Sequence, residues 1–599
     1  MAVKKESSLS ASLQRLRDTD LSSYIPMARS VLPVILDDIL KSLDERQRSV
    51  VDKVLPVGGK KKIYLQLVDT PTPPIVIEMA QPLKISTMSE KEVKRQRIRG
   101  VRLTIDDIQL LAKGRSLGNM LKLSWRLKRQ MFTILRIFWM VRPLLRLRAT
   151  ISKDMGNQLT AKYKPLLDLS AETKSETTDQ GDMLKILMDD TRSYVEAMKI
   201  IMPETAPVLE MRAKNFEDYY RAKETGQKVA WINFATPPEL FYAMDIVPFV
   251  YDGLAFQAAA SGFALKYIDI AEQYVPDHLC SDNKIHLGLA LSGDIPPADL
   301  LIYPSSPCDS NRTILSAMAE YCNIPSFCLD LPYYKDERAL QYLTDEWKRL
   351  VSFLEEVTGK KLDVDKLRQV MEYSNIAHEY CLKLDEFRKL APCPFTSLDM
   401  YMDGGVLIQF AGTPELVDYY KVRYDLTKER MAKKEGTGAE EKFRVVWAYG
   451  VYVPDIGVFS WLEEKYGAVS INCMNFNWVV KPTEDLSTYD SMLRGLAEKT
   501  TLMPMNREVH GPMENFIDAT VDLCKRYKAD CAIVTGHVAC KSNWAVMKLM
   551  KDKIEEECGI PMLVFEVDLF DTRLISVDGV KGKLEEFFET IVIPKNAGR

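Results

Sequence analysis

From residue 228 onward, short apolar segments alternate with longer helical stretches, and this alternation limits the possible folds more than any other feature. The strand candidates are Lys228–Phe234, Ala298–Tyr303 and Pro325–Leu329, and Phe443–Tyr449 begins a second series. Between the two series, Lys335–Glu379 is expected to be largely helical. Strands separated by helices are typical of parallel α/β layers, because parallel neighbours need a crossover connection. We therefore expect an α/β protein with two parallel-sheet lobes.

The two series contain an internal repeat that places a cysteine after a strand in each. An Ala-Asp pair ending at Asp299 opens one strand, and Cys308 follows nine residues later. A second Ala-Asp pair ends at Asp530, and Cys540 follows ten residues later. In open α/β sheets, ligands bind beyond the carboxyl ends of the strands. Two Rossmann-like lobes facing each other would form a cleft with a cysteine on each wall.

The cysteines are the candidate metal ligands. There are 11 of them, an odd number, beside five histidines, and the first ten residues hold no apolar signal region. A disulfide framework is therefore disfavoured and a cytosolic protein is expected. Cys280, Cys308 and Cys540 lie in polar loops with small residues, where backbone N–H groups can approach an anion or a cluster sulfide. Lys541 is expected to lower the pKa of the Cys540 thiol.

No CxxC pair occurs, so spacing alone leaves the three loop cysteines open as either structural thiols or iron–sulfur ligands. Six of the other cysteines lie on apolar faces and are expected to be small core residues. These six are Cys322, Cys328, Cys381, Cys524, Cys531 and Cys558, whereas Cys393 and Cys473 are left unassigned.

A series of short sequences stands in a specific order between residues 190 and 595. It comprises Pro237-Pro238-Glu239-Leu240, Cys280-Ser281, Gly293-Asp294, Cys308-Asp309, Asp330-Leu331-Pro332 and His537 with Cys540-Lys541. This order resembles the 2-hydroxyacyl-CoA dehydratase / benzoyl-CoA reductase family. The resemblance covers about two-thirds of the chain.

The resemblance implies a [4Fe–4S] cluster bound by Cys280, Cys308 and Cys540. The fourth iron site would be open to water, hydroxide, sulfide or a substrate oxygen. A homologous sister subunit or a homodimer is also implied, as is a separate ATP-hydrolysing iron–sulfur activator that injects an electron. The sequence has no GxxxxGK[ST] P-loop, so any use of ATP would lie on a partner.

The implied reaction is the radical elimination of water from a (R)-2-hydroxyacyl-CoA. One electron reduces the thioester carbonyl to a ketyl, which expels the 2-hydroxyl group before the electron returns. Glu239 matches a family glutamate near the open iron and is predicted to supply a proton; the alternative is a helix-start carboxylate stabilised by the helix dipole. His537 is predicted to orient a ligand or donate a proton. The alternative is that it only makes hydrogen bonds within its own loop.

Two other functions stay open on the sequence alone. The first is an ATP-dependent benzoyl-CoA-reductase-type subunit that reduces an aromatic acyl-CoA. The second is a non-catalytic protein, either an electron relay or a lipid-tethered, cluster-binding partner.

The N-terminal third is expected to be an α+β and helical extension. Strand candidates Lys61–Leu67, Pro74–Met79 and Val101–Asp106 precede Leu121–Thr150, which has eight basic residues and no acidic one. Residues 50–150 weakly resemble the sterol-carrier-like fold. The basic segment is predicted to lie on a membrane surface or an acyl chain, or to be a core or partner-docking helix with snorkelling arginines. Its apolar run Ile137–Val141 is far shorter than the ~20 residues that span a bilayer.

These features divide the chain into six segments. The N-terminal segments are a helical segment 1–50, a sterol-carrier-like unit 51–150 with the basic amphipathic helix, and a linker 151–190. They are followed by a first α/β lobe 191–335 with two cluster cysteines, a helical segment and hinge 336–440, and a second α/β lobe 441–599 with the third cluster cysteine. The net charge of −4 disfavours a nucleic-acid partner. We expect a cytoplasmic location, with contact to the membrane periphery through residues 121–150.

Overall fold

The computed structural model describes two parts of the chain separately. Described are residues 61–67, 74–79, 84–103, 191–192, 195, 199, 206–260, 262–295, 297–433, 440–450, 452–477 and 480–597. Contacts divide the chain into one unit of residues 1–173 with 197–203, and another of 174–196 with 204–599. The basic segment 121–150 and the predicted linker 151–190 lie outside the described residues. No helix within the described ranges is long and apolar enough to cross a membrane.

The first unit contains a four-stranded sheet. Its order is β3 (Lys84–Thr87), β2 (Ile75–Met79), β1 (Lys61–Leu67) and β4 (Arg99–Leu103). The pairs β3/β2 and β2/β1 are antiparallel, whereas β1 and β4 are parallel, and α4 (Glu90–Arg95) precedes β4. Strands were predicted at or near β1, β2 and β4, but not at β3. The likeness to a sterol-carrier unit stays a prediction.

The first lobe of the second unit is built on an all-parallel sheet. The strands β5 (Lys228–Ile232), β6 (Ile246–Val250), β7 (Leu300–Pro304) and β8 (Ser326–Leu329) stand in the order β6-β5-β7-β8. Strands β6 and β7 are buried along their whole length, as expected where helices cover both faces. The helices of this lobe are α10 (Ala206–Thr225), α11 (Glu239–Ala243), α12 (Asp252–Ala260), α13 (Ala264–Ala271), α14 (Ser281–Ser292) and α15 (Asp309–Cys322).

The second lobe repeats this topology. Its strands β9 (Phe443–Tyr449), β10 (Ala468–Cys473), β11 (Cys531–His537) and β12 (Met562–Val567) are all parallel, in the order β10-β9-β11-β12. In both sheets the first strand along the chain lies between the second and the third, so the predicted two-lobed α/β fold is confirmed. The longer helices here are α20 (Val458–Tyr466), α22 (Met513–Arg526), α23 (Lys541–Cys558) and α24 (Val577–Phe587). Helix α21 (Tyr489–Leu502) comes from the same stretch of chain but packs against α16 (Glu337–Thr358).

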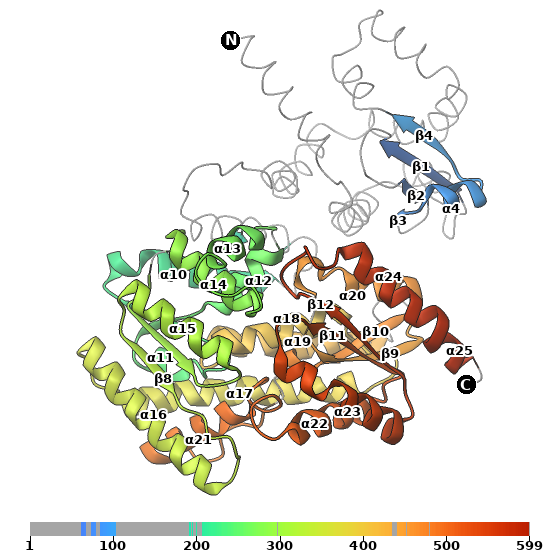
Figure 1. Ribbon diagram of the computed structural model, residues 1–599. Helices are drawn as coiled ribbons and strands as arrows, with labels where there is room; N and C mark the ends of the chain where they lie inside the picture. The colour runs from blue at the N-terminus through green and yellow to red at the C-terminus, as the bar shows by residue number, and fades with distance from the viewer. Residues whose placement is uncertain are drawn as a thin grey trace, which may run out of the picture. The chain divides into compact units, whose positions relative to one another are not determined.

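A helical segment connects the two lobes (Figure 1). It consists of α16 (Glu337–Thr358), α17 (Val364–Arg388), α18 (Ser397–Phe410) and α19 (Pro414–Lys433). Helix α18 packs against β10 of the second sheet and β6 of the first, and thereby fixes the lobes to each other. Buried ion pairs hold these helices together: Asp403 accepts from Arg388 of α17 at 2.6 Å and from Arg423 of α19 at 3.1 Å.

Candidate metal centre

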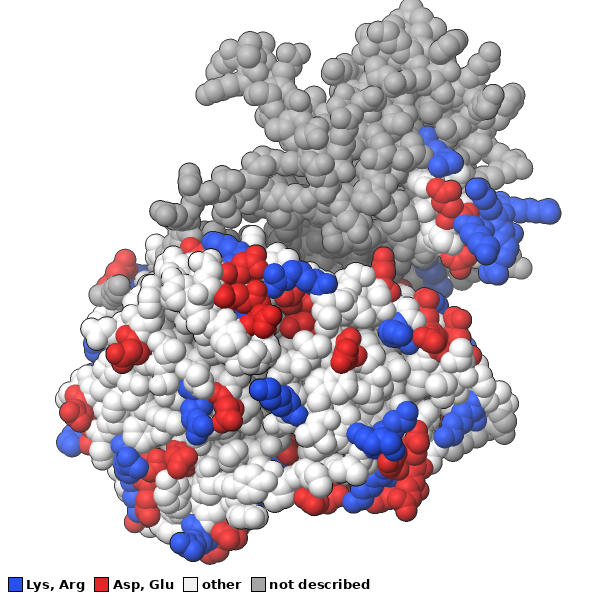
Figure 2. Space-filling model, viewed as in Figure 1, with Lys and Arg blue, Asp and Glu red and all other residues white. Residues whose placement is uncertain are grey.

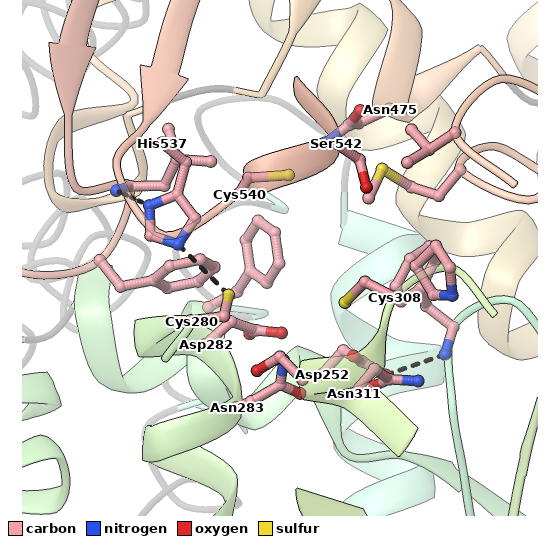
Figure 3. A pocket seen from close by; sticks show the side chains of 18 of the residues that line it. Asp252, Cys280, Asp282, Asn283, Cys308, Asn311, Asn475, His537, Cys540 and Ser542 are labelled. Atoms are coloured by element: carbon pink, nitrogen blue, oxygen red, sulfur yellow. Dashed lines mark hydrogen bonds between the residues drawn. The ribbon is translucent and has the colours of Figure 1, made fainter. Parts of the chain in front are cut away.

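A cavity of about 980 Å³ lies between the lobes and receives side chains from both. Cys280 and Cys308 line it from the first lobe, and Cys540 lines it from the second. Figure 3 shows the three sulfurs around one common space. Cys308 follows the end of β7 and Cys540 follows the end of β11, so the carboxyl ends of both sheets meet this cavity, where α/β folds bind ligands.

Each of the three cysteines is the residue that precedes a helix. Cys280 is the N-cap of α14, Cys308 of α15 and Cys540 of α23. No side-chain oxygen caps these helices, so the first-turn N–H groups face the sulfurs and the space beyond them. Backbone N–H groups interact with each sulfur, among them those of Ser310 and Asn311 with Cys308. Three helix N-termini therefore direct partial positive charge into one cavity, which favours an anionic ligand there.

Burial keeps the three thiols protonated when no metal is bound. It raises the pKa of Cys308 to about 11, and it raises the pKa values of Cys280 and Cys540. The expected lowering of the Cys540 pKa by Lys541 is therefore wrong, because burial raises this pKa and outweighs the hydrogen bonds from Tyr449 and from the backbone N–H groups of Ser542 and Asn543. A metal that takes these sulfurs as thiolates releases their protons on binding.

Two residues of the second lobe hydrogen-bond to the sulfurs. The backbone N–H of Leu569 donates to Nδ1 of His537 at 3.4 Å, which leaves the proton of the neutral ring on Nε2. That nitrogen lies 3.2 Å from the sulfur of Cys280. The hydroxyl of Tyr449 donates to the sulfur of Cys540 at 3.1 Å. The sequence pointed to His537 but not to Tyr449, although Tyr449 ends the correctly predicted strand β9.

Asp568 ties the second lobe to the start of α14. It accepts from the hydroxyl of Ser281 at 2.5 Å and from the backbone N–H groups of Phe570 and Asp571, both at 2.9 Å. Because Ser281 follows Cys280 directly, this contact fixes the first-lobe cysteine relative to the loop after β12.

Glu239 is not brought to this cavity. It is completely buried at the start of α11, where it accepts from Lys499 Nζ at 2.5 Å and from the Ser374 hydroxyl at 2.7 Å. Burial by itself would raise the pKa of this carboxyl, but Lys499 and Ser374 hold it below its ordinary value. Glu239 and Lys499 form a buried ion pair. The role of Glu239 as a proton donor stays a prediction.

The remaining cysteines lie apart from the cavity lining. Cys524 and Cys531 are buried core residues as expected, and the unassigned Cys393 and Cys473 are buried as well. The chemistry of the lining fits an iron–sulfur cluster, since soft thiolates with N–H donors around them are the usual ligands of such groups. The three cysteines suffice for three of the four irons of a cubane cluster.

Charged residues of both signs lie on the face of the second unit that Figure 2 shows. Figure 2 shows basic and acidic residues interspersed over the described part of the face in view, without a continuous basic surface. This distribution is in line with the small net charge.

Comparisons with known proteins agree with the motif order. A family model described as "2-hydroxyglutaryl-CoA dehydratase, D-component" matches residues 233–591. The (R)-phenyllactyl-CoA dehydratase alpha subunit of Clostridium sporogenes is 24% identical over 389 residues, which cover 63% of this chain and 92% of that protein. The (R)-2-hydroxyisocaproyl-CoA dehydratase alpha subunit of Clostridioides difficile is 23% identical over 65% of this chain and 96% of its own. A benzoyl-CoA reductase subunit of Thauera aromatica is 24% identical over a match that covers 64% of this chain and 93% of that protein.

Proposed function

The chain belongs to the 2-hydroxyglutaryl-CoA dehydratase D-component family, and we propose that it is the [4Fe–4S] subunit of an enzyme that eliminates water from a (R)-2-hydroxyacyl-CoA. The observation that carries this proposal is the convergence of Cys280, Cys308 and Cys540, each at a helix N-terminus, on one cavity. Relatives named as acyl-CoA dehydratase alpha subunits support the reaction class.

The three cysteines would hold the cluster, and the bound cluster supplies a one-electron relay and a Lewis-acidic iron. The protein's own contribution starts with Nε2–H of His537 and the hydroxyl of Tyr449, which donate to two of the sulfurs. Such donors stabilise negative charge on the sulfurs and thereby favour reduction. His537 thus acts as a positioning and tuning residue rather than as a proton donor to the substrate.

Apolar side chains of the cavity would cover the acyl chain and exclude water. Phe234, Phe256 and Phe570 line it, and the rings of Phe256 and Phe570 pack edge to face with centroids 5.2 Å apart. One ring of this pair comes from each lobe, so the lobes close the apolar wall together. Exclusion of water protects a reactive radical from side reactions.

A benzoyl-CoA-reductase-type activity is the second candidate. It is favoured by the match to the benzoyl-CoA reductase relative, whose identity to this chain equals that of the phenyllactyl-CoA dehydratase relative. The aromatic wall of the cavity is compatible with either substrate. A non-catalytic electron-relay protein remains the alternative from a different class.

The proposed partners follow from the same family. The relatives are named as subunits, so a sister subunit completes the enzyme. A separate ATP-hydrolysing activator would inject the electron, since the sequence has no P-loop.

We also propose that residues 121–150 contact lipid at the membrane surface. Co-sedimentation of the full chain with anionic liposomes at low salt would support this contact, and absence of the chain from the pellet would contradict it.

The experiment is an anaerobic assay of the chain together with its sister subunit and an activator ATPase. We expect dehydration of 2-hydroxyacyl-CoA esters, such as lactoyl- or phenyllactyl-CoA, to enoyl-CoA products with catalytic amounts of ATP. Reduction of benzoyl-CoA in place of dehydration selects the second candidate. If the complex holds its full cluster but converts neither class of ester, the chain is a non-catalytic electron-relay protein.

A further inference from the structure

Beside the three cysteines there is a second group of side chains of the kinds that bind metal ions. Asp252, Asp282 and His286 each offer one oxygen or nitrogen, and these atoms lie within 4.8 Å of one another. Asp252 and Asp282 line the cavity, and Figure 3 shows both carboxylates beside Cys280 and Cys308. Neither residue was singled out from the sequence.

Two helices and the end of a strand bring the three side chains together. Asp282 and His286 are four residues apart on α14 and so lie on one face of that helix. Asp252 is the first residue of α12 and is held from the end of β5: Asn233 Nδ2 donates to it at 3.2 Å and the backbone N–H of Phe234 at 2.8 Å. Partners of this kind orient carboxylates that ligate metals.

Within the described part of the chain, two members of the cluster, His286 and Asp282, have buried polar atoms without the hydrogen-bond partners that such atoms need. His286 is 2% exposed, and neither of its ring nitrogens has a hydrogen-bond partner among the described residues. Its Nε2 faces Oδ1 of Asp282 at 3.6 Å, and that oxygen is also buried without a hydrogen-bond partner there. No lysine or arginine of the described ranges forms an ion pair with Asp252 or Asp282. Asp252 is 4% exposed and the side chain of Asp282 is 17% exposed, and burying carboxylates to this degree without a cation is costly.

We propose that Asp252, Asp282 and His286 bind a divalent first-row transition-metal ion, separate from the cysteine site. Two carboxylates and an imidazole are the donor set that Mn²⁺, Fe²⁺ and Zn²⁺ accept, whereas Ca²⁺ and Mg²⁺ prefer oxygen alone. The cation neutralises both carboxylates and supplies the partner that the imidazole lacks. The cavity gives the ion a path of entry and leaves coordination positions for water or a substrate oxygen.

The test is a Mn²⁺ titration of the full-length chain under anaerobic conditions, with free Mn²⁺ read by electron paramagnetic resonance. Mn²⁺ is a hard ion and avoids thiolates, so it reports on the oxygen and nitrogen donors. We expect about one tight site per chain, and Asp252→Asn or His286→Gln to weaken it at least about 10-fold. Asp309→Asn is the control, because this aspartate also begins a helix at the cavity but its side chain is 92% exposed.

Thermal unfolding gives a second readout. Mn²⁺ is expected to raise the unfolding temperature of the wild-type chain and of the Asp309→Asn variant, but not that of Asp252→Asn. Cys308→Ser should keep its Mn²⁺ site, which separates this proposal from that of the iron–sulfur cluster. Equal Mn²⁺ affinity in wild type and in Asp252→Asn and His286→Gln, or no tight site in the wild type, overturns the proposal.

Discussion

The imidazole Nε2 of His537 lies 3.2 Å from the sulfur of Cys280, and this contact joins the two lobes at the cavity. His537 is the last residue of β11 in the second lobe, whereas Cys280 immediately precedes α14 in the first. The cysteine set is therefore complete only when the lobes are held in this arrangement.

Loss of a hydrogen bond to sulfur should change the cluster's potential while the cluster stays bound. His537→Gln and Tyr449→Phe each alter or remove one donor. Both are expected to make the reduction potential more negative, because the reduced state carries more charge on sulfur. A redox titration followed by electron paramagnetic resonance measures the shift, with His278→Gln at an exposed histidine as the control. Unchanged potentials in both variants would contradict the assignment.

Glu239→Gln should destabilise the protein and leave the cluster in place. The substitution leaves Lys499, which is 5% exposed, as an unpaired buried cation. Breaking a buried pair on one side costs about 3–5 kcal/mol. Thermal unfolding measures the loss, and adding Lys499→Met to the same chain is expected to restore part of it. Full stability together with abolished dehydration would instead identify Glu239 as the proton donor.

The close packing of α14 on α13 makes Gly288 intolerant of a side chain. A Cβ at this position would lie 2.0 Å from the backbone oxygen of Tyr267. Gly288→Ala is expected to cost roughly 1–3 kcal/mol and to reduce iron retention, because Cys280 moves with α14. Gly582→Ala in α24 is the matched control: it has open space and should gain up to about 1 kcal/mol. Equal unfolding temperatures for the two variants would show that α14 can shift freely.

His378 should make the protein sensitive to mild acid. Burial, together with Lys499, lowers the pKa of this histidine to about 3, whereas in the unfolded chain it is ~6.5. Between these values only the unfolded chain binds the proton, so stability falls as the pH falls, by up to about 1.4 kcal/mol per pH unit. Unfolding temperatures at pH 7, 6 and 5 should decline less steeply in His378→Gln. Parallel declines would refute the assignment of His378 as an acid-sensitive group; burial also lowers the pKa of His286 to about 3, and this histidine is present in both chains.

Some strands could be predicted from their β-branched or aromatic residues. The segments Lys61–Leu67 and Phe443–Tyr449 match β1 and β9 at both ends. The missed strand β3, Lys84–Thr87, is short and has one apolar residue, and its pairing with β2 places it in the sheet. Strands β6 and β10 were missed as well, although both contain β-branched residues. The local residue pattern was enough to predict β1 and β9, but it was not enough to predict β3.

The site could be predicted only in part, for the same reason. The three cysteines follow motif order and were found from the chain alone, but Glu239 was placed near the metal without knowledge of Lys499, which lies 260 residues away. The pairing of Asp252 with Asp282 depends on how α12 packs beside α14. Contacts of this range leave no spacing signal in the sequence.

The iron and sulfide content after anaerobic reconstitution tests the cluster assignment most directly. The wild-type chain should hold about four irons and four sulfides. Cys280→Ser, Cys308→Ser and Cys540→Ser should each remove most of this iron, whereas Cys531→Ser, in a fully buried thiol of β11, should keep it. Less than about one iron per wild-type chain, or loss of iron in Cys531→Ser with retention in Cys540→Ser, would contradict the central claim.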